Sequence, residues 1–215
     1  MHSITVFLFM NMRNWRNETE QQEVGEETRT ISIEKPQLEG DPQGNKIYFY
    51  TDISKDTILT LNKQIDTVTK QMRVLQVNYD LASPPPIELH ICSDGGDVFA
   101  SMASFDKILS NPVPIHTYIE GVVASGGTIL SVAGAQRFIT RNSCMLIHQV
   151  SSGLWGNYMQ FKDELKNLEL IMTLIRSVYL KRSKFKTKQL DNLLKHDLFL
   201  SAEECLKRGL VDHII

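Results

Sequence analysis

Short apolar runs alternate with amphipathic stretches from residue 46 to residue 147, and this alternation constrains the fold more than any other feature. Short apolar runs are typical of buried strands, whereas apolar positions three or four residues apart are typical of helices. Strands that alternate with helices predict βαβ units around a largely parallel sheet, which is an α/β fold. The expected strands are 47–50, 87–92, 115–123 and 137–147, and the expected helices are 98–109, 125–133 and one that begins after the N-cap Ser54 and stops before the prolines at 84–86.

The regions on either side of this alternating part have a different character. Residues 1–45 are polar, acidic and rich in turn residues, so we expect a flexible N-terminal arm, with one strand at 28–33, ahead of a folded domain at 46–215. A long helix is expected at about 157–182, with a narrow apolar seam that packs either on its own domain or on a partner subunit. The seam residues are Tyr158, Phe161, Leu165, Leu168, Met172, Ile175 and Tyr179.

Length and charge limit the classes of protein that fit. A chain of 215 residues suits one α/β domain with a short appendage. The formal net charge of -2 argues against nucleic-acid binding, and we interpret the basic run at 181–188 as a solvated face. No stretch approaches the roughly 20 apolar residues that span a bilayer, and the apolar run at 4–10 lacks the flanks of a secretory signal. We therefore expect a cytoplasmic protein without membrane association.

Metal and cofactor chemistry are disfavoured by the motifs. Cys92, Cys144 and Cys205 lie far apart in the sequence, so their spacing builds neither a disulfide framework nor a zinc site. The sequence also lacks the GxxxxGK[ST] phosphate loop, a GxGxxG turn after a strand, the HExxH zinc motif and the GxSxG elbow of α/β-hydrolases. We expect no metal and no cofactor in this chain.

Three residues have the chemical types of a catalytic triad. Ser125 lies where an apolar strand gives way to a helix, His148 ends a strand, and Asp197 precedes the run at 198–200. A serine nucleophile needs a base that takes its proton and a carboxylate that holds the imidazole tautomer. Each residue alone has a simpler interpretation, as a helix N-cap, a packed histidine and a surface charge. Sequence spacing leaves open whether the three meet in space.

Two glycine turns accompany the candidate nucleophile. Gly95 and Gly96 follow the expected strand at 87–92, and ligand crevices of α/β sheets form at the carboxyl ends of such strands. The amides of Gly96 and Gly126 together would make a two-donor oxyanion hole. The simpler interpretation is a tight turn that needs positive φ.

The order and spacing of four motifs resemble the Clp protease proteolytic subunit family. Residues 91–96, ICSDGG, resemble the family's INSPGG turn, and residues 124–127, ASGG, resemble its nucleophile motif ASMG. Residues 145–149, MLIHQ, resemble the segment that holds the family's histidine. Residues 197–212 resemble its closing DxFLSAxEAxxYGLVD. The resemblance covers about 87–215 and weakens over 46–86.

The resemblance implies a crotonase-like fold of stacked βαβ units with a protruding handle helix. It implies that Ser125 is the nucleophile, His148 the general base and Asp197 the carboxylate that orients it, with oxyanion amides from Gly96 and Gly126. The function that follows is a serine endopeptidase.

The resemblance also implies partners. A peptide or unfolded protein would bind as an extended strand between the edge at Gly95 and the loop around Gly153. The expected assembly is a homo-oligomer of heptameric rings stacked in pairs through the handle helices. A AAA+ unfoldase is a candidate partner, and any ATP dependence would come from it.

Several positions depart from the family's pattern. Asp94 replaces the proline beside the oxyanion turn, and Gly126 replaces the methionine after the nucleophile. Residues 195–196 replace an acidic-arginine pair linked to ring assembly. At the unfoldase-docking surface His90 replaces an aromatic residue, whereas Phe138 retains one.

These departures leave two further hypotheses open. One is a Clp-like assembly or regulatory subunit with little proteolysis of its own. The other is a crotonase-fold enzyme that acts on acyl-CoA, which would not need Ser125 and His148. Retention of all three triad residue types favours the peptidase.

Overall fold

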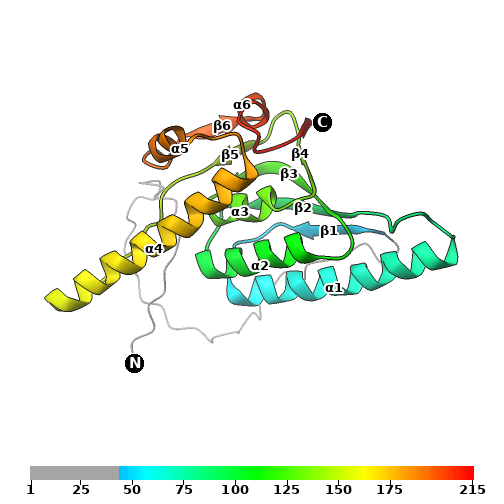
Figure 1. Ribbon diagram of the computed structural model, residues 1–215, viewed down its shortest axis with the longest axis horizontal. Coiled ribbons are helices and arrows are strands. Elements are labelled where there is room, and N and C mark those ends of the chain that lie inside the picture. Colours follow the sequence, from blue (N-terminus) through cyan, green and yellow to red (C-terminus); the bar gives the residue numbers. More distant parts are fainter. Residues whose placement is uncertain (1–43) are drawn as a thin grey trace, which may run out of the picture.

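A computed structural model of the chain describes residues 44–215 (Figure 1). The flexible arm expected at 1–45, the strand expected at 28–33 and the interpretation of the apolar run at 4–10 concern residues outside this range, except for residues 44 and 45. Among residues 44–215, no helix is long and apolar enough to cross a bilayer.

The described part of the chain folds around a sheet of seven strands, as the alternating pattern predicted. Four parallel pairings give the order β1-β2-β3-β4-β7, while β5 runs parallel to β3 and antiparallel to β6. Registers such as Ile47 opposite Leu89 and Leu89 opposite Thr117 align the expected apolar runs. The strands are β1 (Lys46–Phe49), β2 (Ile87–Ser93), β3 (Ile115–Ala124), β4 (Gln136–Ile139), β5 (Cys144–Leu146), β6 (Phe199–Ser201) and β7 (His213–Ile214).

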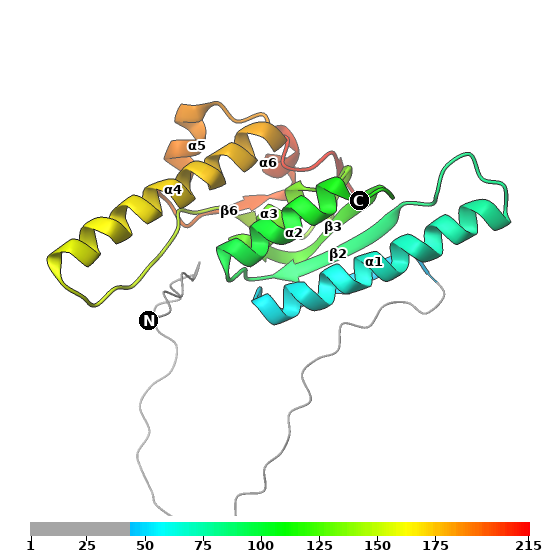
Figure 2. The same ribbon diagram turned by 60° about the horizontal axis from the view of Figure 1, so that its bottom comes forward.

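Helices α1 (Lys55–Asn78), α2 (Val98–Ser110) and α3 (Gly126–Val132) follow the first three strands. Figure 2 shows α1 and α2 packed on the same side of β2 and β3. The predicted N-cap Ser54 forms a capping box with Thr57. The apolar side chains on the sheet-facing side of α1 are buried: Ile58, Leu61, Ile65, Val68 and Met72. Alternate strand residues such as Phe49, Leu89 and Ile91 are fully buried against these helices, so the core lies between the sheet and the helix layer.

The single strand expected at 137–147 is wrong. The chain forms β4, turns at 140–143 where the Ser143 amide donates to the Thr140 carbonyl at 3.0 Å, and then forms β5. Both strands pair with β3, which has positive φ at Gly121 between the two pairing stretches. The polar residues at 140–143 mark this turn in the sequence, and the apolar residues on both sides of them gave the appearance of one strand.

The helix α4 (Tyr158–Arg182) extends away from the body of the molecule with its first half (Figures 1 and 2). Tyr158 and Leu165 in that half are exposed, whereas Ile175 and Tyr179 in the second half are buried. The second half of the seam packs on its own domain, whereas the first half is exposed and fits the interpretation of a surface for a partner subunit. The short helices α5 (Thr187–Leu193) and α6 (Ala202–Lys207) follow near the C-terminal strand.

Candidate active site

Ser125 lies between the end of β3 and the start of α3 in an unusual backbone conformation. Its φ is 55° and its ψ is -123°, a region that non-glycine residues avoid. The side chain makes no hydrogen bond to the helix, so the interpretation of Ser125 as an ordinary capping residue is wrong. The Ser125 amide donates to the Leu146 carbonyl at 2.8 Å, and this bond holds the turn against β5. The buried hydroxyl is thereby directed away from the helix.

His148 reaches Ser125 because β5 pairs with the end of β3. Ala124 lies opposite Leu146 in this parallel pairing, so the residues just after both strands lie at the same edge of the sheet. The distance from His148 Nε2 to Ser125 Oγ is 2.9 Å, a hydrogen bond between two buried side chains. The imidazole is therefore placed to take the hydroxyl proton.

Asp197 completes the group from the C-terminal part of the chain. It precedes β6, whose antiparallel pairing with β5 places Phe199 opposite Leu146. The distance from Asp197 Oδ1 to His148 Nδ1 is 3.5 Å, and the carboxylate side chain is 63% exposed. Asp197 thus faces the correct ring nitrogen, but at a long distance and in contact with solvent.

Burial lowers the pKa of His148 below its ordinary value of 6.5, and the nearby Asp197 carboxylate opposes this shift. The imidazole is consequently neutral at neutral pH. A neutral imidazole is the form that can accept the proton of a serine hydroxyl.

The turn at Gly95 and Gly96 packs directly against the nucleophile. Gly95 has φ 99° and Gly96 has φ 143°, and a Cβ built on Gly95 would lie 2.6 Å from Ser125 Cβ. A Cβ built on Gly126 would lie 3.5 Å from the Gly96 amide nitrogen, so the two candidate oxyanion donors are neighbours. Ile53 holds this turn, because its amide donates to the Gly95 carbonyl at 2.7 Å and its carbonyl accepts from the Asp97 amide at 2.9 Å.

The remaining sequence-predicted positions lie at the border of this group. A Cβ built on Gly153 would meet no atom within 4 Å, so this part of the 150–157 loop borders open space. Asp94 is exposed at the end of β2, next to Gly95. The structure therefore gathers the three triad candidates and the glycine turns, and leaves Gly153 as an open edge.

Two buried residues that support the nucleophile were missed by sequence reasoning. The Thr128 hydroxyl donates to the Ser125 carbonyl at 2.6 Å and is also 2.6 Å from the Tyr179 hydroxyl. Tyr179 is buried, and burial raises the pKa of its phenol. The apolar spacing identifies Tyr179 only as a seam residue. Such spacing depends on the apolar ring, so it does not predict the hydrogen bond of the hydroxyl group.

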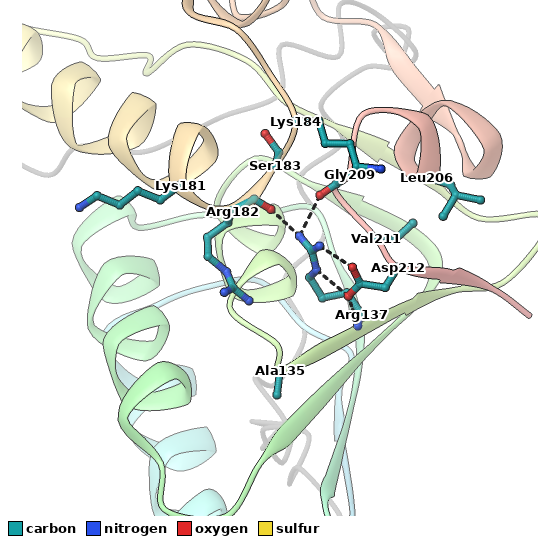
Figure 3. Close-up of a pocket in the computed structure, with 10 residues that line it drawn as sticks. All are labelled: Ala135, Arg137, Lys181, Arg182, Ser183, Lys184, Leu206, Gly209, Val211 and Asp212. Atoms are coloured by element: carbon teal, nitrogen blue, oxygen red, sulfur yellow. Dashed lines mark hydrogen bonds and ion pairs between the residues drawn. The ribbon is translucent and has the colours of Figure 1, made fainter.

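A separate cavity of about 400 Å³ lies where β4, the end of α4 and the chain after α6 meet (Figure 3). Arg137 binds Asp212 through two nitrogens and donates to the Gly209 carbonyl at 2.9 Å, and Arg182 donates to the Val132 carbonyl at 2.8 Å. Because these donors are engaged by the protein itself, we interpret the cluster as structural.

A buried serine–histidine hydrogen bond, a carboxylate on the far ring nitrogen and two glycine amides beside the serine are the geometry of a serine hydrolase site in an α/β protein. The model of the Clp protease family matches residues 42–215. The chain belongs to the Clp protease family, and the resemblance seen in its motifs is confirmed.

Sequence and structural similarity to known proteins supports membership of this family. The chain is 28% identical over 183 residues to the ATP-dependent Clp protease proteolytic subunit of Deinococcus radiodurans, a match that covers 83% of this chain and 90% of that protein. A solved structure of a ClpP1 mutant from Listeria monocytogenes superposes with a TM-score of 0.68 at 23% identity, covering 80% of this chain and 91% of that one. This structural likeness confirms the predicted fold.

Proposed function

We propose that the chain is the serine endopeptidase subunit of a barrel-shaped oligomer, and that it hydrolyses peptide bonds of peptides and unfolded proteins. The observation that carries this proposal is the 2.9 Å hydrogen-bond distance between Ser125 Oγ and His148 Nε2, with the serine held at φ 55°. Membership of the Clp protease family supports it. The chain itself contributes no cofactor to this reaction.

In the proposed acylation step, Ser125 Oγ attacks the carbonyl carbon of the scissile bond while His148 Nε2 takes its proton. The negative charge that forms on the carbonyl oxygen is bound by the amides of Gly96 and Gly126. The Asp197 carboxylate stabilises the imidazolium through Nδ1–H. The C–N bond then breaks, and His148 returns its proton to the leaving amine, which leaves an acyl ester on Ser125.

Hydrolysis of the ester reverses these roles. A water molecule attacks the acyl carbon, and His148 takes a proton from it as the general base. Collapse of the second tetrahedral intermediate breaks the ester bond, and the proton on His148 passes to Ser125 Oγ. The product carboxylic acid leaves and the free serine is restored.

A fluorophosphonate serine-hydrolase probe tests the triad on the purified full-length chain. We expect one adduct, located by mass spectrometry on Ser125 and absent from Ser125→Ala. His148→Ala should lower the labelling rate by at least about 10²-fold, because the base is lost. Ser131→Ala is the matched control, since this buried helix serine lies outside the triad. An intact oligomer that the probe leaves unlabelled would contradict the proposal.

A regulatory or assembly subunit is the second candidate function. It is favoured by the exposure of Asp197, the 3.5 Å distance to His148 and the negative charge of Asp94 beside the oxyanion turn. An unlabelled oligomer that changes the activity of a co-assembled peptidase would support this function in place of the first.

Assembly into rings and docking of a AAA+ unfoldase belong to the same proposal. The exposed first half of α4 provides apolar side chains for contact between rings. The sheet face opposite the core carries a continuous stack of rings, with centroid distances of 4.7 Å from Tyr48 to His90, 4.8 Å from His90 to Tyr118 and 4.6 Å from Tyr118 to Phe138. Tyr48 and Tyr50 remain 37% and 53% exposed, which suits contact with a partner.

A further inference from the structure

Glu164 is a buried acidic side chain in the part of α4 that is otherwise open to solvent. It is 6% exposed, whereas its neighbours Asp163 and Leu165 are exposed. Acidic side chains are seldom buried in proteins unless they have partners. The position of Glu164 therefore needs a structural reason.

The partner of Glu164 is Ser152 in the 150–157 loop. The Ser152 hydroxyl donates to Glu164 Oε1 at 2.6 Å, a short hydrogen bond. The other carboxyl oxygen, Oε2, is buried and has no hydrogen-bond partner. Among the residues that the structure describes, the bond from Ser152 is consequently the hydrogen bond that holds this carboxyl beneath the loop.

The same loop joins the catalytic candidates to α4. It begins two residues after His148, and the Val150 amide donates to Met172 Sδ at 3.3 Å. Ser152 directly precedes Gly153, where the loop borders open space. Ser152 thus links this loop by a side-chain hydrogen bond to the projecting half of α4.

We infer that Glu164 is a positioning residue for peptide substrates: through Ser152 it holds the 150–157 loop, which follows His148, in the position that the proposed extended substrate contacts. This inference rests on the proposed function and extends it to a residue outside the triad. An extended peptide binds mainly through backbone hydrogen bonds to strand edges, so an edge that is fixed beforehand lowers the entropic cost of binding.

Two readouts test the inference, because the loop is needed for an extended peptide but not for a small probe. Glu164→Ala and Ser152→Ala should each raise KM for a fluorogenic peptide of about six residues roughly tenfold, which corresponds to the loss of one good hydrogen bond. The value of kcat and the rate of fluorophosphonate labelling at Ser125 should stay within about twofold. The double variant should be no worse than either single variant, because both remove the same contact.

Matched variants separate positioning from general damage. Glu164→Gln should keep KM near that of the unchanged protein, since its amide oxygen can still accept from Ser152. Asp163→Ala, on the exposed side of the same turn, should have no effect. Equal losses of labelling and peptide hydrolysis in Glu164→Ala, or an unchanged KM in both alanine variants, would overturn the inference.

Hydrogen exchange keeps the inference testable even if the chain proves to lack peptidase activity. The amides of residues 150–157 should exchange faster in Glu164→Ala than in Asp163→Ala, while those of β3 and β5 stay unchanged. Unchanged exchange in the loop would show that Glu164 does not hold it. Absence of labelling in the unchanged protein would instead count against the proposed function.

Discussion

At the residue scale, the backbone of Ser125 has a strained conformation. A non-glycine residue at φ 55° and ψ -123° costs on the order of 1–3 kcal/mol, so surrounding contacts must maintain it. The bond from its amide to the Leu146 carbonyl and the bond from Thr128 to its own carbonyl supply these contacts. The hydroxyl is thereby held ready for His148 before any substrate arrives.

The exposure of Asp197 leads to a prediction about pH dependence. Burial lowers the pKa of His148, and the Asp197 carboxylate raises it in part. Asp197→Asn removes the raising contribution, so the acid limb of kcat/KM should move to lower pH. We expect kcat to fall by roughly 10- to 10²-fold, the low end for a catalytic contact, because the carboxylate is solvated.

A pH–rate profile with a peptide substrate measures both effects for Asp197→Asn. Asp106→Asn is the matched control, because it removes an exposed carboxylate of α2 that lies outside the candidate site. An acid limb that moves to higher pH in Asp197→Asn would contradict the assignment of Asp197.

Gly96 provides a prediction about stability. A Cβ at this position would lie 2.1 Å from the Ile53 carbonyl oxygen on a backbone with φ 143°, so Gly96→Ala must displace one of the two segments. We expect a loss of at least about 1–3 kcal/mol in the free energy of unfolding, measured by urea denaturation. Gly153→Ala should leave stability within about 0.5 kcal/mol, because its Cβ would enter open space. Equal stability of the two variants would refute the account of the turn.

At the element scale, α4 is one helix with two environments. Its second half buries Ile171, Ile175 and Val178 against the body of the molecule, while Tyr158, Phe161 and Leu165 of its first half are exposed. Exposed apolar side chains on a projecting helix suit the contact between subunits that the proposed assembly requires.

We therefore expect Leu165→Glu to dissociate the oligomer. The residue is 60% exposed, so a charge there leaves the fold of the single chain intact but is costly inside an apolar contact. Multi-angle light scattering should report a lower particle mass, with unchanged circular dichroism. Val77→Glu is the control, because Val77 of α1 is also well exposed, at 79%, and this variant should leave the particle mass unchanged. A full-mass particle in Leu165→Glu would exclude this half of α4 as an interface.

At the scale of the whole molecule, Arg137 joins the sheet to the C-terminal part of the chain. Its guanidinium, with a side chain 11% exposed, binds Asp212 at 2.7 Å and the Gly209 carbonyl at 2.9 Å (Figure 3). The hydrogen bond from Arg137 holds the pKa of the Asp212 carboxyl below its ordinary value of 3.8. This pair fixes the segment that carries β7 beside β4.

Arg137→Ala should lower the free energy of unfolding by about 1–3 kcal/mol, because it leaves the part-buried carbonyls of Arg182 and Gly209 without their donor. Since the folded pKa of Asp212 is lowered, its contribution is present above pH 3.8 and is lost as the pH falls through the lower folded value. The difference in the free energy of unfolding between the unchanged protein and Arg137→Ala should accordingly become smaller below pH 3.8. Urea denaturation at equal protein concentration measures this difference. As a control, Arg141→Ala removes an exposed arginine and should change the free energy of unfolding by less than about 0.5 kcal/mol. A similar loss in both variants would argue against a structural role of the Arg137 contacts.

The sequence by itself determined the α/β class, the long helices and the identity of the candidate site residues. Periodicity is a local property, so the buried positions of α1 and the N-cap Ser54 could be predicted without a structure. The turn at 95–96 and the order of Ser125, His148 and Asp197 were readable through the four motifs that contain them, because the order and spacing of these motifs resemble the Clp protease family.

Only the tertiary structure decided how these residues meet. The pairing of β4 and β5 with separate stretches of β3 is set by the sheet, and the three-residue strand β6 is too short for a periodic signal. The conformation of Ser125, the exposure of Asp197 and the burial of Glu164 each depend on contacts with segments distant in sequence. Such contacts are set by packing between elements, which the local pattern of a single segment does not encode.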